Sequence, residues 1–202
     1  MPQASELTRL APSLSLWQAY DPAVKSDLFA TAVKTRAGLF LVDPIPLDPA
    51  SLEELTGPDP VAGILLTNAN HLRAAEAFAG RFKAPIFSAP MVAAEFPAGS
   101  ARPVADAEEI SPGVSVIAIA GGAPGETAFH FADQSGTMVV GDALINFEPY
   151  GFTFLPPKYC TDHKEMRRSL RRLLDWPFQR LFFAHGMPIL SSARERLETL
   201  LR

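Results

Sequence analysis

The residues best suited to chemistry are a carboxylate and an imidazole that each follow an apolar run. Asp142 comes after Val139-Val140-Gly141, and His185 comes after the apolar residues 181–184. Carboxylate oxygens and imidazole nitrogens bind zinc and similar metals, and both groups also act in general acid–base catalysis. Cys160 is the only cysteine, so no thiolate cluster can hold a metal. Asp142 and His185 are therefore the first candidates for catalytic or metal-binding residues.

A further polar segment lies where an apolar run, residues 61–66, leads into a predicted helix. It reads Thr67-Asn68-Ala69-Asn70-His71-Leu72-Arg73. Asparagine amides offer neutral oxygens, which bind cations poorly unless carboxylates supplement them, and asparagine is also a favoured N-cap residue. Arg73 is permanently charged, so it repels a dication and pairs naturally with a carboxylate. The segment indicates either a ligand pocket or, for Asn68 and Asn70, simple helix capping.

Alternating and apolar runs predict that a layered α/β fold carries these residues. Strands are expected at residues 14–20, 28–34, 38–42, 61–66, 84–88, 114–120, 127–131, 136–140 and 181–184. Helices are expected after a capping box at Ser51 and Glu54, at residues 71–82 and 91–96, after Asp162, and at residues 193–201. The turn at residues 133–136 should join two strands.

Length and composition fit one domain over residues 1–202. Hydrophobic residues make up 48% of the chain and charged residues 20%, which are ordinary values for a soluble globular protein. The net charge of -4 argues against a nucleic-acid partner, because phosphate binding usually needs a basic face. The N-terminus does not have the pattern of a signal peptide and no apolar run reaches membrane-spanning length, so we expect a cytoplasmic protein without a membrane partner.

Five segments, in this order, resemble motifs of the metallo-β-lactamase superfamily over about residues 29–188. They are Leu39–Pro44, an early strand ending in Asp; Thr67–Arg73, similar to T-H-x-H-x-D-H; Ala120–Glu126, similar to P-G-H-T-P-G-S; Val139–Leu144, similar to a strand ending in Gly-Asp; and Phe183–Pro188, similar to G-H-G-x-P. The resemblance implies an α/β fold, a four-layer αββα sandwich of two mixed β-sheets with outer helices. Its metal ligands would cluster along one edge.

The same resemblance implies that most metal ligands have been replaced. The ligand positions hold Asn68, Asn70, Leu72, Arg73 and Gly122, while Asp142 and His185 are retained. We therefore expect the dinuclear zinc site to be lost and no cofactor to be required, although the family uses zinc or another divalent metal. Arg73 is expected to donate to Asp142 in place of the metals. Asn68, Asn70 and His185 would complete this hydrogen-bonded cluster.

The other candidate residues have simpler expected roles. His71 falls at a variable position of the motif, so its ring is expected to point away from the former metal site. Asp43 is expected to cap the turn after its strand. His130 lies inside an alternating strand and His163 in the first turn of a helix, which favours structural or surface roles for both. No oligomeric state follows from the sequence.

Two functions fit these residues. The first is a hydrolase-like protein without zinc-dependent hydrolysis that binds a small acidic molecule or a partner in the remnant pocket. The second is an active hydrolase of ester or thioester-type substrates, with one metal ion on Asp142 and His185. Metal analysis of the purified protein would distinguish the two.

Overall fold

Two mixed β-sheets face each other in the computed structural model, which describes residues 1–132 and 135–202. The first sheet has seven strands, in the order β1 (Thr8–Ala11), β2 (Leu14–Asp21), β3 (Ser26–Thr35), β4 (Gly38–Val42), β5 (Val61–Leu65), β6 (Ile86–Ser88) and β7 (Ala101–Pro103). The second sheet has the order β14 (Arg180–Phe183), β11 (Thr137–Val140), β10 (Thr127–Phe131), β9 (Val114–Ala118) and β8 (Glu109–Ser111). Strands β12 (Leu144–Phe147) and β13 (Gly151–Phe154) form a separate hairpin.

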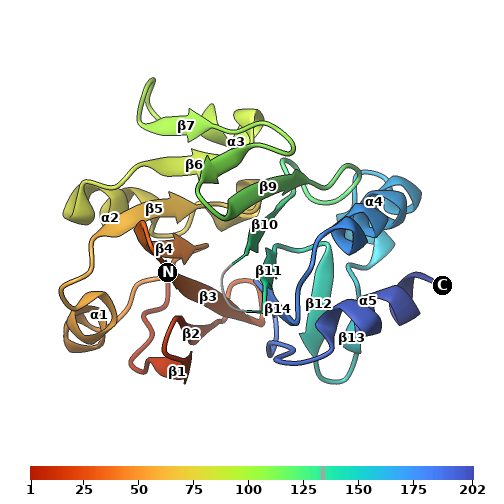
Figure 1. Cartoon of the computed structure of the whole chain (residues 1–202), viewed down its shortest axis with the longest axis horizontal. Coiled ribbons are helices and arrows are strands. Elements are labelled where there is room, and N and C mark those ends of the chain that lie inside the picture. The colour runs from red at the N-terminus through yellow and green to blue at the C-terminus, as the bar shows by residue number, and fades with distance from the viewer. Residues whose placement is uncertain (133–134) are drawn as a thin grey trace.

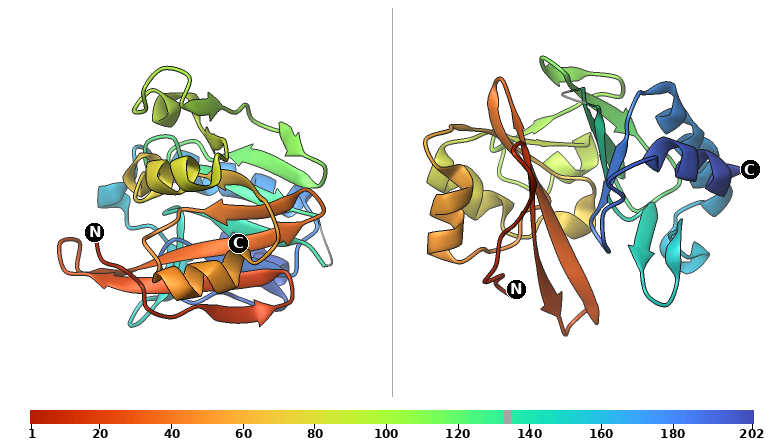
Figure 2. Two further views of the ribbon diagram at one scale, coloured as in Figure 1. Left: turned by 90° about the vertical axis from the view of Figure 1, so that its left-hand side faces the viewer. Right: turned by 60° about the horizontal axis from the view of Figure 1, so that its bottom comes forward.

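Helices cover the outer face of each sheet (Figures 1 and 2). The helices are α1 (Pro49–Thr56), α2 (Ala75–Phe82), α3 (Pro90–Ala93), α4 (His163–Leu170) and α5 (Ala193–Leu201), with single 3-10 segments η1 (Ala69–His71), η2 (Pro157–Tyr159) and η3 (Arg171–Asp175). Helices α1 and α2 pack on the seven-stranded sheet, and α4 and α5 pack on the five-stranded sheet. The predicted four-layer αββα sandwich is confirmed. None of the described helices is long and apolar enough to cross a membrane.

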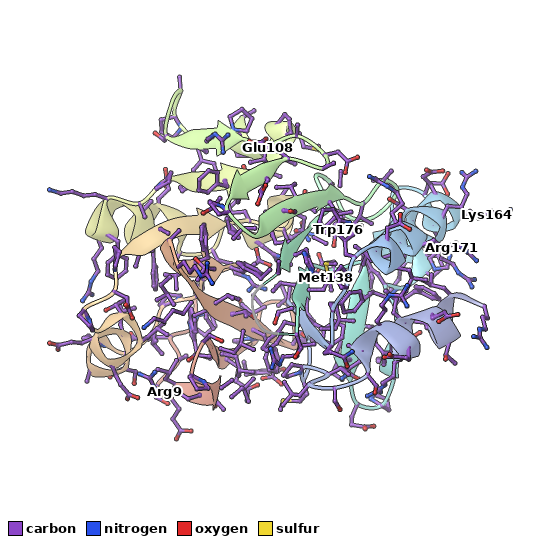
Figure 3. All side chains as sticks on the ribbon, viewed as in Figure 1. Arg9, Glu108, Met138, Lys164, Arg171 and Trp176 are labelled. Carbon is purple, nitrogen blue, oxygen red and sulfur yellow. The ribbon has the colours of Figure 1, made fainter. Side chains whose placement is uncertain are left out.

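Alternation along the strands divides the buried side chains among three apolar clusters. Figure 3 draws the side chains on the ribbon. On β4, Phe40 packs between the sheets, whereas Leu39 and Leu41 pack with the residues of α1 and α2. On β14, Phe182 lies between the sheets, and its two neighbours pack beneath α4 and α5. Successive side chains of a strand point to opposite faces, so a strand buried on both faces is apolar throughout.

Helices α1 and α2 start at other residues than predicted, whereas α5 spans the predicted residues. Helix α1 begins at Pro49, and its N-cap is Asp48 rather than the predicted capping box, because the Asp48 side chain accepts from the free amides of the first turn. Helix α2 begins at Ala75 rather than at residue 71. Asp162 caps α4 as predicted. The predicted turn at residues 133–136 includes Asp133 and Gln134, which lie outside the described residues.

Candidate metal site

The polar candidates meet at one edge of the sandwich because they follow the ends of parallel strands. Strands β4 and β5 are parallel and lead to Asp43 and Thr67, while β11 and β14 are parallel and lead to Asp142 and His185. The carboxyl ends of parallel strands open on the same edge of a sheet, where α/β proteins usually hold their ligands. A hydrogen bond from the Phe29 amide on β3 to the Ala184 carbonyl, 3.0 Å long, joins the two sheets beside this edge.

His71 lies at the centre of the site, between two buried carboxylates. Its Nδ1 is 3.0 Å from Asp43 Oδ2, and its Nε2 is 3.3 Å from Asp142 Oδ1. The side chain is only 3% exposed, so the prediction that it points away from the site is wrong. The backbone explains the difference. Residues 69–71 form a 3-10 turn instead of the first turn of a helix, and Arg73 has a left-handed φ of 40°, which a motif alignment does not anticipate.

His185 follows β14 of the five-stranded sheet and approaches the same Asp142 oxygen as His71 does. Its Nε2 is 3.3 Å from Asp142 Oδ1, and its Nδ1 is 3.0 Å from the backbone carbonyl of Asp27. A carbonyl oxygen only accepts, so Nδ1 carries a hydrogen, and the ring presents Nε2 to Asp142. Asp43 acts on His71 Nδ1 in the same way. Such outer contacts are typical of histidines that bind metals, because they fix the tautomer and the direction of the ring.

Three donor atoms therefore converge, from His71, Asp142 and His185, and all lie within 4.8 Å of one another. In a tetrahedral zinc site with bonds of 2.0–2.1 Å, ligand atoms stand about 3.3 Å apart, which matches both imidazole-to-carboxylate distances of 3.3 Å. Moreover, His71 Nε2 is buried and has no hydrogen-bond partner among the described residues, although the carboxylate is near. Two imidazoles and a carboxylate suit zinc or iron(II). These residues fit one divalent metal ion.

The other oxygen of Asp142 is held by two amide groups. Asn68 Nδ2 and Asn70 Nδ2 lie 3.2 Å and 3.1 Å from Asp142 Oδ2. The Asn68 Oδ1 atom accepts from the Asn70 amide at 2.9 Å, and this N-cap bond fixes which end of the Asn68 amide faces the carboxylate. Asn68 thus combines both roles that the sequence left open. Two amide groups therefore face this oxygen of Asp142.

Glu126 belongs to the same cluster and was not predicted from the sequence. Its side chain is buried, with Oε2 accepting from Asn68 Nδ2 and Oε1 accepting from the Ala143 amide, both at 2.9 Å. Gly122 makes room for it, because a Cβ atom at Gly122 would lie 2.8 Å from Glu126 Cγ. A charged residue directly before the apolar strand β10 was the available signal. Gly122 itself offers only its backbone carbonyl, which accepts from Thr161.

Arg73 does not form the expected bond with Asp142. Its Nη1 donates instead to the backbone carbonyls of Phe29 and Asp43, at 2.7 Å and 2.9 Å. The side chain ties Phe29, in the first half of β3, to Asp43, directly after β4. Within the described part of the chain, its Nη2 is buried without a hydrogen-bond partner. Burial lowers the pKa of Arg73, and the charges of Asp43 and Asp142 oppose this effect. Arg73 therefore interacts with both carboxylates through its charge.

The charges of the metal-free cluster balance. Burial lowers the pKa of His71, but the neighbouring Asp142 and Asp43 carboxylates outweigh it and raise this pKa to about 9. Burial would raise the pKa of Asp142, but the two imidazoles lower it well below its ordinary value. Burial and the Asp142 charge raise the pKa of Glu126 to about 8. At neutral pH two carboxylates therefore face the His71 imidazolium and the Arg73 guanidinium, with Glu126 protonated.

The two remaining histidines lie outside the cluster. His130 is buried on β10, where its Nε2 is 2.8 Å from the Pro177 carbonyl and its ring packs against Trp176. His163 begins α4 and packs edge-on against Phe154. His130 thus lies inside its strand as predicted, whereas His163, predicted at the surface, is half-buried against Phe154.

Comparison with known proteins identifies the family. The model of the metallo-beta-lactamase superfamily matches residues 6–202, so the chain belongs to this superfamily. No curated protein sequence matches the chain.

Among solved structures, DIM-1 metallo-beta-lactamase is similar with a TM-score of 0.74 at 13% identity, over 99% of this chain and 97% of that one. A metallo-beta-lactamase family protein from Thermus thermophilus has a TM-score of 0.67 at 23% identity, over 96% of this chain and 79% of that one. A metallo-beta-lactamase from Pontibacter korlensis has a TM-score of 0.71 at 16% identity, over 97% of this chain and 98% of that one. These likenesses concern the fold.

Proposed function

We propose that this chain binds one divalent metal ion through His71, Asp142 and His185 and hydrolyses ester or thioester-type substrates. One observation carries the proposal: two imidazole Nε2 atoms converge on a single oxygen of Asp142, each at 3.3 Å. The membership in a superfamily of metallo-β-lactamases supports hydrolysis as the reaction. A divalent metal in such a site lowers the pKa of a bound water and polarises a carbonyl group.

The chain's own residues supply the orientation. Asp43 holds His71, and the Asp27 carbonyl holds His185, so that both rings present Nε2 to the same point. Asn68 and Asn70 bind the far oxygen of Asp142 and keep its near oxygen turned toward the imidazoles. Asn70 is exposed and the His185 side chain is 18% exposed, so a substrate can approach from this side.

Metal analysis tests the proposal directly. The purified protein is loaded with zinc, manganese or iron(II), desalted, and measured for metal per chain by mass spectrometry. We expect one equivalent of metal per chain in the wild type. Each of the variants His71→Gln, Asp142→Asn and His185→Gln should lower the metal occupancy at least about tenfold. His163→Gln is the matched control, because that histidine packs against Phe154 outside the cluster. Two equivalents, or one equivalent that survives His71→Gln, would contradict the assignment.

A second candidate function is binding without hydrolysis, and the charge balance of the metal-free cluster favours it. With the pKa of His71 raised to about 9, its imidazolium and the Arg73 guanidinium compensate both aspartates without any metal. The remnant pocket would then take a small, acidic molecule or a protein partner. In that case the metal analysis yields no bound metal, and added zinc leaves the melting temperature of the protein unchanged.

A further inference from the structure

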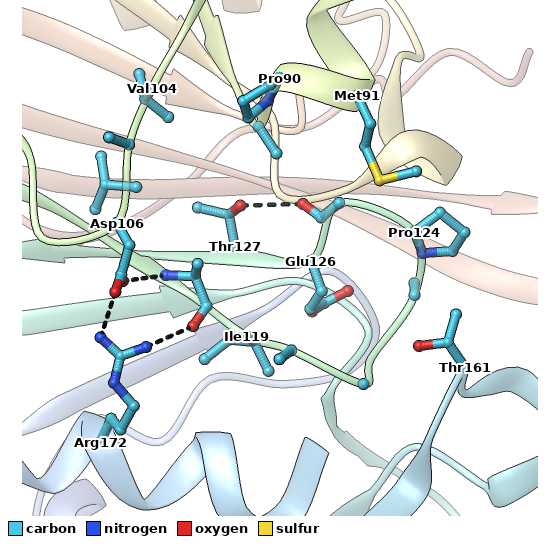
Figure 4. Close-up of a pocket in the computed structure, with 18 residues that line it drawn as sticks. Pro90, Met91, Val104, Asp106, Ile119, Pro124, Glu126, Thr127, Thr161 and Arg172 are labelled. Atoms are coloured by element: carbon cyan, nitrogen blue, oxygen red, sulfur yellow. Dashed lines mark hydrogen bonds and ion pairs between the residues drawn. The ribbon is translucent and has the colours of Figure 1, made fainter. Parts of the chain in front are cut away.

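A cavity lies along the loop of residues 121–126, beside the candidate metal site, and Glu126 of this loop belongs to both (Figure 4). It has a volume of about 560 Å³, within the range of pockets that hold small molecules. Its walls come from the start of α3, the segment after β7, strand β9, the loop itself and η3. None of the three proposed metal ligands lines it. We propose that this cavity binds a small apolar monoanion, of the class of medium-chain carboxylic acids.

Apolar side chains form most of the wall. Val104 and Ile119 are buried there, Pro90 and Pro124 stand opposite, and Met91 is 55% exposed at the rim. The neighbouring hydroxyl groups are already committed, because Thr127 donates to the Gly125 carbonyl and Thr161 donates to the Gly122 carbonyl. Their hydrogens are therefore not available to a ligand, and the apolar lining favours an apolar ligand body that covers the exposed part of Met91.

One end of the cavity carries a positive group with unused donors. Arg172 donates from Nη1 to the Ala118 carbonyl at 3.2 Å and from Nη2 to Asp106 Oδ2 at 2.6 Å. A guanidinium has five N–H groups, so these two bonds leave donors for an incoming acceptor. Asp106 also accepts from the Ala118 amide at 2.9 Å, which fixes the pair against β9. The geometry gives the ligand a direction, with its anionic group at Arg172 and its apolar body toward Met91 (Figure 4).

Asp106 limits the charge of the ligand to one. It lies beside Arg172 and is paired with it. A second negative charge on the ligand would lie near this carboxylate, whereas Arg172 is the single guanidinium among the described residues that line the cavity. A dianion is therefore disfavoured relative to a monoanion of the same size.

Calorimetric titration with octanoate tests the proposal, with 1-octanol as the neutral match and suberate as the dianionic match. We expect one octanoate per chain, with weaker binding of both analogues. Arg172→Met should weaken octanoate about tenfold and leave octanol unchanged. Met91→Asp should weaken both. The controls are Arg168→Met, which lies outside the cavity and pairs with Glu165, and Met187→Asp, at a methionine that is 57% exposed elsewhere.

Three results would overturn the proposal. One is a lack of octanoate binding to the folded wild-type protein. Another is octanoate binding that Arg172→Met leaves unchanged, since the anionic group would then be elsewhere. The third is octanoate binding that is lost in His185→Gln, because the carboxylate would then sit at the candidate metal site. This last variant also keeps the test independent of the proposed hydrolase function.

Discussion

His71 should make the stability of the metal-free protein depend on pH. Its folded-state pKa is raised from 6.5 to about 9, because Asp142 and Asp43 stabilise the imidazolium more than burial disfavours it. The protonated form is therefore the form that folding favours. Its contribution is complete below the unfolded pKa and is lost as the pH rises through the folded one. A shift of about 2.5 units corresponds to about 3 kcal/mol of unfolding free energy.

Urea unfolding of chelator-treated protein at about pH 6 and about pH 9.5 measures this contribution. The variant His71→Gln has a side chain of similar polarity that cannot ionise. Between the two pH values, the unfolding free energy of the wild type should fall by about 3 kcal/mol more than that of this variant. Deprotonation of Glu126, whose pKa is raised to about 8, also lowers the stability over this range, and the His71 charge shifts that pKa, so both proteins also carry Glu126→Gln. Equal losses in the two proteins would refute the idea of a buried imidazolium.

Two further predictions concern the metal. A metal needs neutral His71, so each bound ion displaces a proton. The apparent metal affinity should therefore rise about tenfold per pH unit below pH 9. A competition assay with a chromophoric chelator measures this affinity, and a profile that does not change with pH would contradict the prediction. Asp43→Asn should weaken metal binding by about 10- to 100-fold in the same assay, because Asp43 holds His71 Nδ1 at 3.0 Å. Asp48→Asn, at the N-cap of α1, is the control and should leave the affinity unchanged.

The pattern of apolar residues predicted the layered α/β class because it reports burial directly, and the family resemblance implied the four-layer arrangement. Strands such as β4 and β14 are apolar on both faces, and this already indicates sheets covered on both sides. Asp142 and His185 could be predicted for a related reason, since a polar residue directly after such a strand lies at the sheet edge. Their meeting at 3.3 Å required only the parallel pairing of β11 and β14.

The rest of the site depends on backbone details that residue types do not reveal. His71 enters the cluster through a 3-10 turn and a left-handed Arg73, whereas the motif assigns it to a position without a ligand. Arg73 binds two backbone carbonyls, and a carbonyl acceptor leaves no trace in the sequence of side chains. Glu126 follows a glycine-rich loop, where its burial depends on the space that Gly122 leaves.

Gly122 and Glu126 form a coupled pair, and this coupling makes a second metal site difficult to restore. The family places a histidine at Gly122, but a Cβ atom there would lie 2.8 Å from Glu126 Cγ and 2.9 Å from Glu126 Cβ, closer than such atoms normally approach. The Glu126 carboxyl also holds the Asn68 amide beside Asp142 Oδ2. Histidines placed at the three motif positions alone would therefore leave this space occupied.

The variant Asn68→His/Asn70→His/Gly122→His should for this reason bind no more metal than the wild type and melt at a lower temperature. Adding Glu126→Ser, the residue type that the related loop carries, removes the clash and the competing carboxyl group together. We expect the metal content to rise by one equivalent only with this fourth change, measured by mass spectrometry after desalting. Glu126→Ser by itself is the control for the loss of the carboxyl group. If the threefold variant already gains the additional metal, then Glu126 does not block the first site, and the amides alone account for its absence.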